Sequence, residues 1–289
     1  MSTTLTPPPN APATPPASGP SGEPPRTSRP AARVVAILTI VLGALVLAGA
    51  ALAAVFSTVL AAAVHTDSRT ADAAGITELD VDVSAGSFEL VFGDVDEAVL
   101  EVTSGAGADR WRLDRDAGTL VVDSPRALFG GWLFGGSGHA VLTLPAALER
   151  TTLDATYSLS AGDLDAQGRY GDLSVEMGAG AMRIEGSARE VDADVSAGRA
   201  DLLLSGVSRA DLSVSAGRLV GVLRGDAPDA VGIDVSAGSL ELTLPDAAYD
   251  VRAEVSAGEL DNRLETAVSS PRVIEATVSA GQVILRSAD

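Results

Sequence analysis

The chain has 289 residues, of which 46% are apolar and only 3% aromatic, and its formal net charge is −19. The absence of cysteine excludes disulfides and thiolate metal sites, and the presence of only two histidines leaves little material for imidazole chemistry. The excess of acids over the 20 arginines argues against nucleic-acid partners, because such a surface repels phosphate.

The first segment, residues 1–33, is a proline-rich leader that carries ten of the chain's fifteen prolines. Serine, threonine, alanine and glycine separate these prolines. A composition of this kind cannot bury an apolar core, so we expect a disordered tail.

The second segment, residues 34–64, contains no charged residue. Because about 20 apolar residues suffice to span a bilayer, this run predicts one transmembrane α-helix. A cleaved signal peptide is the alternative, with "AAA" at Ala61–Ala63 as its cleavage site. The apolar core of a signal peptide, however, normally has only about 7–15 residues.

The arginines around the apolar run predict its orientation. Arg26, Arg29 and Arg33 precede it, whereas only Arg69 follows closely. The positive-inside rule then places the N-terminus in the cytoplasm and the C-terminal part outside, as in a single-pass cell-membrane protein. The expected divisions are a cytoplasmic tail at 1–33, a membrane span at 34–64, a linker at 65–75 and an extracytoplasmic domain at 76–289.

The third segment contains a repeated motif. "VSAG" occurs six times, and "LSAG" and "MGAG" are close variants. Their last residues are the structural repeat positions Gly86, Gly162, Gly180, Gly198, Gly217, Gly238, Gly258 and Gly281. A period of about 20 residues with strand-like content is typical of repeat architectures.

Each repeat alternates apolar and polar residues on both sides of the motif. This alternation predicts strands with one buried face. Ile233, Val235 and Ala237 are expected to point inward, and the spacing from Ala237 to Leu240 indicates a bend between two strands. Glycine suits such a bend because it accepts positive φ and close approach of another backbone.

These patterns predict an all-β fold of the β-solenoid or β-helix type, built from stacked coils of about 20 residues. A two-sheet sandwich is the alternative, and it would require more Asn-Gly or Asp-Gly turns. The less regular stretch 76–150 is expected to act as an atypical terminal region.

A resemblance to a known family rests on coils such as "VSAGSLEL" and on strand ends that read "LTLP", at Leu142–Pro145 and Leu242–Pro245. With these motifs and the preceding apolar run, the stretch from about Ile76 to Leu285 resembles the bacterial putative-adhesin family. These are β-repeat envelope proteins whose domain has no assigned function. The resemblance implies a solenoid-like β domain and an envelope role, sometimes linked to the stress response, and it implies no catalytic residues.

Acidic side chains recur just before the bends and are expected on the outward face. They are Asp80, Asp82, Asp192, Asp194, Asp211, Asp234 and Glu254. Such oxygen ligands suit calcium, but a solvated, aggregation-resistant face is the preferred interpretation, so neither a metal site nor a cofactor is expected.

A polysaccharide-cleaving enzyme is the catalytic alternative, because such a site needs a base beside clustered acids. Arg199 and Arg218 follow successive bend glycines, and Asp201 lies nearby. Charge pairing on the surface is the preferred interpretation. No Gly-x-Ser-x-Gly motif occurs, and His139 has no evident serine partner, so no catalytic residue is expected.

The stretch from Pro125 to His139 is the most aromatic part of the chain. Phe129, Trp132 and Phe134 would either cover an open end of the stack or form a contact loop for glycan, lipid or protein. The expected function is that of a membrane-anchored, non-catalytic envelope protein displaying an acidic scaffold or adhesin-like binding domain. Its expected partners are the membrane, cell-wall polymers or other envelope proteins. The alternatives are a polysaccharide-active enzyme and an accessory protein of envelope-stress signalling.

Overall fold

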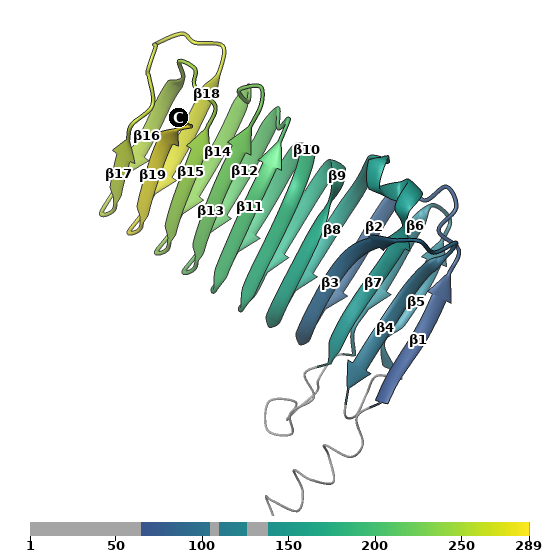
Figure 1. Cartoon of the computed structure of the whole chain (residues 1–289). Helices are drawn as coiled ribbons and strands as arrows, with labels where there is room; N and C mark the ends of the chain where they lie inside the picture. Colours follow the sequence, from purple (N-terminus) through teal and green to yellow (C-terminus); the bar gives the residue numbers. More distant parts are fainter. Residues whose placement is uncertain (1–64, 105–109, 126–137, 289) are drawn as a thin grey trace, which may run out of the picture. The chain divides into compact units, whose positions relative to one another are not determined.

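The computed structural model describes residues 65–104, 110–125 and 138–288. These residues form β-strands and one short 3-10 helix, η2 (Ala146–Arg150) (Figure 1). Within these ranges no helix has the length and apolar character needed to cross a membrane. The predicted transmembrane segment 34–64 and the predicted tail 1–33 lie outside the described residues.

The strands lie in two facing layers, which we call row A and row B (Figure 1). In spatial order, row A contains β5 (Arg112–Asp116), β6 (Thr119–Asp123), β2 (Glu78–Val83), β8 (Leu153–Leu159), parts of β9 and β10, β12 (Arg209–Val214), β14 (Ala230–Val235), β18 (Val273–Val278) and β16 (Asp250–Val255). Row B contains β1 (His65–Ala71), β4 (Ala98–Ser104), β7 (His139–Pro145), β3 (Gly86–Gly93), parts of β9 and β10, β11 (Arg199–Ser205), β13 (Arg218–Arg224), β15 (Ser239–Leu244), β19 (Gln282–Ser287) and β17 (Glu259–Asn262).

Two long strands join the rows into one 19-stranded sheet. β9 (Gly162–Met177) and β10 (Ala181–Val195) begin in row B and end in row A. We call each row-A strand, together with the row-B strand that follows it, a rung. Neighbouring rungs pair in parallel and in register, so that Leu212 faces Ile233 and Leu219 faces Leu240. Equivalent residues of successive repeats are therefore neighbours across strands, about 4.8 Å apart.

Alternate side chains of both rows enclose one hydrophobic core. Val231, Ile233 and Val235 of β14 are buried, and so are all three leucines of β15. The predicted alternation of buried and outward residues is therefore present on both sides of the bend. Each fully buried aliphatic side chain of this kind stabilises the fold by about 1.5–3 kcal/mol.

Corners of two or three residues connect the row-A strand to the row-B strand in every rung except that of β6 and β7, and the eight predicted bend glycines lie in one file along this edge. At Gly180 φ is +111°, and a Cβ would overlap the carbonyl oxygen of Gly162 in the next corner. Backbone hydrogen bonds link the corners, for example from the Ala197 N–H to the Gly178 carbonyl (2.9 Å). The expectation that Ala237 points inward is wrong, because the corner alanines are exposed.

The predicted β-solenoid is also wrong. In a solenoid each coil stacks on the coil before it in sequence, whereas here that order fails at both ends of the sheet. At one end, the rung of β2 and β3 lies between the rung of β6 and β7 and the rung of β8 and β9. At the other end, the rung of β18 and β19 lies between the rung of β14 and β15 and the rung of β16 and β17. Strands β1, β4 and β5 pair antiparallel. The fold class is therefore an all-β sheet with both parallel and antiparallel pairing. The order of the rungs can differ from their order in sequence because their edges are equivalent.

The two ends of the sheet differ in how they cover the core. At one end β1 and β5 contact each other, and Trp111 is only 2% exposed. β1 lies within the stretch that the sequence assigned to a linker. At the other end lies the rung of β16 and β17, where Val255 is 44% exposed although it occupies the same repeat position as Val235.

Candidate functional site

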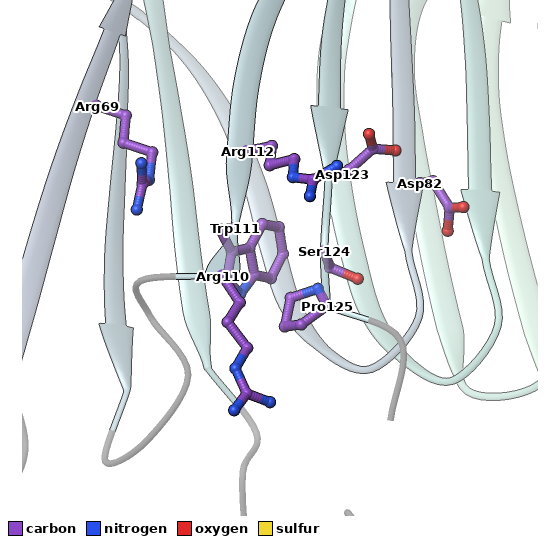
Figure 2. A pocket seen from close by; sticks show the side chains of 8 residues that line it. All are labelled: Arg69, Asp82, Arg110, Trp111, Arg112, Asp123, Ser124 and Pro125. Carbon is purple, nitrogen blue, oxygen red and sulfur yellow. The ribbon is translucent and has the colours of Figure 1, made fainter. Parts of the chain in front are cut away.

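A cavity of about 580 Å³ lies beside the corners at the β1/β5 end of the sheet (Figure 2). We call it the arginine cavity. It is lined by Arg69, Asp82, Arg110, Trp111, Arg112, Asp123, Ser124 and Pro125. These residues come from β1, β2, β5, β6 and the segments next to them.

Strand register brings the lining residues together. β5 and β6 form a hairpin that turns at Ala117, where φ is +53°, and this places Arg112 opposite Asp123. Asp123 in turn faces Asp82 across the parallel pair of β6 and β2. One cation and two carboxylates thus lie in line across three strands, although 41 residues separate Asp82 from Asp123 in sequence.

Backbone bonds hold the wall of the cavity in place. The Ser124 N–H donates to the Asp82 carbonyl (2.9 Å), and the Ser84 N–H donates to Ser124 Oγ (2.6 Å). Ser124 is only 7% exposed, so its hydroxyl is fixed by this contact. These bonds therefore tie the ends of β2 and β6 together next to Asp82 and Asp123.

The arginines of the cavity differ in their partners. Arg69 forms an ion pair with Asp67 (3.1 Å). Arg110 and Arg112 are exposed and flank the buried Trp111, and neither guanidinium forms an ion pair or hydrogen bond with a residue that the structure describes. Both guanidinium groups can therefore bind an external anion.

Carboxylates are crowded next to the cavity. Burial raises the pKa of Asp80, and repulsion from Asp123, Glu78 and Asp82 raises it further. Asp80, next to the cavity, therefore has a higher pKa than an ordinary aspartate.

The outward acids form ladders that are interrupted. In row A, Asp192 faces Asp211, but Asp194 faces Ser213, Asp234 faces Thr277 and Asp80 faces Thr156. Hydroxyl side chains therefore separate most of the carboxylates that were expected on the outward face. In the described ranges, no group of three or more acidic or histidine side chains is arranged to hold a metal ion.

The residues considered for catalysis lie in two places. Arg199 faces Arg218 across strands, and its Nε donates to Asp201 Oδ2 (2.9 Å), which raises the pKa of Arg199. His139 does have a serine neighbour, contrary to the sequence analysis: Ser87 Oγ lies 2.8 Å from its Nδ1. The pairing of β3 with β7 creates this contact across 52 residues of chain.

The predicted contact residues Phe129, Trp132 and Phe134 lie outside the described residues. In the sequence they fall between the end of β6 at Asp123 and the start of β7 at His139. A Cβ on Gly86 would lie 2.5 Å from the Gly138 carbonyl oxygen, so Gly138 takes the place of a corner glycine. No local sequence pattern marks the arginine cavity, because its strands meet only through long-range pairing.

Comparison with known proteins gave structural neighbours only. No family model matches the chain, and no curated protein matches it. Similar solved structures include a putative cell adhesion protein from Clostridium sporogenes, with 12% identity over 78% of this chain and 100% of that chain and a TM-score of 0.39. A putative adhesin from Parabacteroides distasonis has 15% identity over 76% of this chain and 97% of that chain, with a TM-score of 0.44. A putative lipid binding protein from the same species has 16% identity over 76% and 96%, also with a TM-score of 0.44.

Proposed function

We propose that the chain is a non-catalytic binding protein of the cell envelope, held at the membrane by residues 34–64 with its β unit outside. We propose further that the arginine cavity binds an anionic group of an envelope polymer. The supporting observation is that Arg110 and Arg112 line a cavity and form no ion pair with a described residue, in a chain of net charge −19. Guanidinium groups bind phosphate and carboxylate through paired hydrogen bonds.

The net charge of the chain opposes the approach of a polyanion. This repulsion is screened beyond about 8–10 Å at physiological ionic strength, whereas contacts inside the cavity act at short range. Binding should therefore depend less steeply on salt than for a basic protein, in which released counterions dominate.

The test measures binding of a soluble glycerol-phosphate polymer by the full chain in detergent. We expect the R110Q/R112Q variant to lose roughly a hundredfold or more in affinity, since each of the two lost guanidinium contacts contributes about 1.5–3 kcal/mol. The matched control is R218Q/R224Q, which removes two exposed arginines from β13. Equal binding by R110Q/R112Q and the wild type would reject the arginine cavity as the site.

A second candidate function is cleavage of an envelope polysaccharide. Asp82 and Asp123 are cross-strand neighbours in the arginine cavity, so two acids meet three arginines there. Incubation of the full chain with wall polysaccharide, followed by measurement of new chain ends, tests this function. Product formation that D82N/D123N abolishes would replace the first proposal, and the S87A variant tests the Ser87–His139 contact in the same assay.

A further inference from the structure

A second cavity, of about 550 Å³, lies on the edge of the sheet opposite the corners. We call it the glycine hollow. It is lined by Phe92 at the end of β3, Glu149 of η2, the middle of β9 (167–169), the middle of β10 (185–187) and Ser205 of β11. Its volume falls in the range of about 300–1,000 Å³ that is typical of small-ligand sites.

Two stacked glycines create this hollow where β9 and β10 pass from row B to row A. At Gly186 φ is +135°, and a Cβ would overlap the Gly168 carbonyl oxygen. A Cβ on Gly168 would lie 2.9 Å from the Tyr170 ring. A side chain at Gly186 would clash with main chain, and one at Gly168 would require the Tyr170 ring to shift. Main chain therefore forms the floor, and Ser205 Oγ donates to the Gly186 carbonyl (3.1 Å).

Phe92 gives the glycine hollow an aromatic wall. The other aromatic residues that the structure describes are buried, namely Phe88, Trp111, Tyr157, Tyr170 and Tyr249. Phe92 packs on the core but remains partly exposed, and it lines the hollow. A phenyl face open to solvent can pack on the C–H face of a sugar ring.

Polar groups of several kinds surround this aromatic wall. Gln167 and Arg169 are exposed, and neither side chain is hydrogen-bonded to another described residue. Glu185 pairs with Arg183 through one carboxylate oxygen, Oε1, while its second oxygen, Oε2, can accept a further bond. Amide, guanidinium and carboxylate groups together supply both donors and acceptors, which suits hydroxyl groups better than a single charge.

We propose that the glycine hollow binds a neutral sugar unit of an envelope polysaccharide. The ring of the sugar packs on Phe92, and its hydroxyls bond to Gln167, Arg169 and Glu185. This inference goes beyond the proposed anion binding and shares no residue with the arginine cavity. A substitution can therefore abolish binding at one site without changing binding at the other.

The test titrates the full chain in detergent with two probes, the tetramers of glucose and of N-acetylglucosamine. We expect saturable binding of at least one of them. F92L retains an apolar side chain but loses the ring, so we expect it to weaken binding by roughly tenfold, whereas F92Y retains binding. Q167A should weaken binding too, and Q282A, which changes an exposed glutamine of β19, is its matched control.

Thermal unfolding of each variant separates lost binding from lost folding. The proposal is supported if F92L folds like the wild type but binds weakly while R110Q/R112Q binds normally. It is overturned if the wild type binds neither tetramer, or if F92L binds as well as the wild type. Loss of sugar binding in R110Q/R112Q but not in F92L would also overturn it, because the sugar would then occupy the arginine cavity.

Discussion

The hydroxyl oxygens of Tyr157 and Tyr170 lie 3.1 Å apart inside the core, and their rings meet edge to face with centroids 6.0 Å apart. Tyr157 is 0% exposed and Tyr170 is 4% exposed. One hydroxyl therefore donates to the other in a region from which solvent is excluded. A buried polar group that loses its partner costs about 1–3 kcal/mol, whereas removal of both partners can be nearly neutral.

The first prediction is a double-mutant cycle on this pair. Y157F and Y170F should each lower the free energy of unfolding by about 1–3 kcal/mol. Y157F/Y170F should be more stable than the sum of the two single losses implies, because no hydroxyl is then left unpaired. Urea unfolding of all four proteins measures the coupling, and strictly additive losses would show that the hydrogen bond does not stabilise the fold.

The second prediction concerns alkaline pH. Burial raises the pKa of Tyr170 to about 12 and raises the pKa of Tyr157 well above the ordinary value of 10.0. The unfolded chain thus releases these protons at lower pH than the folded chain does. The stabilisation they provide is complete below pH 10 and is lost as the pH rises towards 12.

Tyrosinate absorbance and far-UV circular dichroism, recorded together against pH, check this second prediction. The two signals should change together, and Y157F/Y170F should unfold at higher pH than the wild type. Ionisation of Tyr157 and Tyr170 in a chain that keeps its strand signal would contradict it.

The third prediction compares two glycines with positive φ. Gly180 stands in the file of corners, where a Cβ would overlap the Gly162 carbonyl oxygen, whereas a Cβ on Gly206 would meet nothing within 4 Å. G206A should cost only the backbone strain of about 1–2 kcal/mol. G180A adds a steric clash that forces two rungs apart, so we expect a loss of more than about 3 kcal/mol. Similar thermal midpoints for the two variants would argue against tight corner stacking.

The repeat period and its alternation predicted the corners and both strands of a rung, because these features depend on neighbours in sequence. The order of the rungs could not be predicted in the same way. β18/β19 and β16/β17 present equivalent edges to β14/β15, so local patterns do not decide which pair comes next. The error about Ala237 has a local cause, since the corner changes the direction of side chains before the alternation ends.

The arginine cavity and the glycine hollow could not be predicted, because each depends on contacts between distant segments. Arg112 of β5 and Asp82 of β2 line one cavity because β6 pairs with both strands. Phe92 and Gln167 line another because neighbouring rungs pair with each other. The composition did contain one useful signal. Because only 3% of the residues are aromatic, any aromatic side chain that is partly exposed is a candidate for contact with a ligand. The sequence alone does not show that Phe92 is partly exposed and Phe88 is buried.

The fourth prediction concerns Asp80, whose pKa is raised by burial and by neighbouring carboxylates. Because the pKa of Asp80 in the folded chain lies above the ordinary value of 3.8, its contribution to the free energy of unfolding is complete below pH 3.8. That contribution is lost as the pH rises through the folded-state pKa. D80N should therefore raise the thermal midpoint at pH 7, and the gain should disappear below pH 3.8. D226N removes a charge from an exposed loop and is the control. A gain in D226N equal to that in D80N would point to net charge instead.

The fifth prediction compares one repeat position in two rungs. Val235 and Val255 both precede the corner serine, but Val235 is 0% exposed and Val255 is 44% exposed. β16 lies at the end of row A and pairs only with β18 along its length. V255A should therefore lower the free energy of unfolding much less than V235A, for which we expect a loss of about 2 kcal/mol. Urea unfolding of both variants at low protein concentration measures the difference.

Protein concentration serves as the control for this fifth prediction, because an open rung can be covered by another molecule. If the loss in V255A stays small at every concentration, the rung of β16 and β17 is a true end of the core. A loss in V255A that approaches that of V235A at all concentrations would contradict the prediction, because Val255 would then be buried in solution. The comparison therefore tests whether the exposure at this end of the sheet belongs to the folded chain itself.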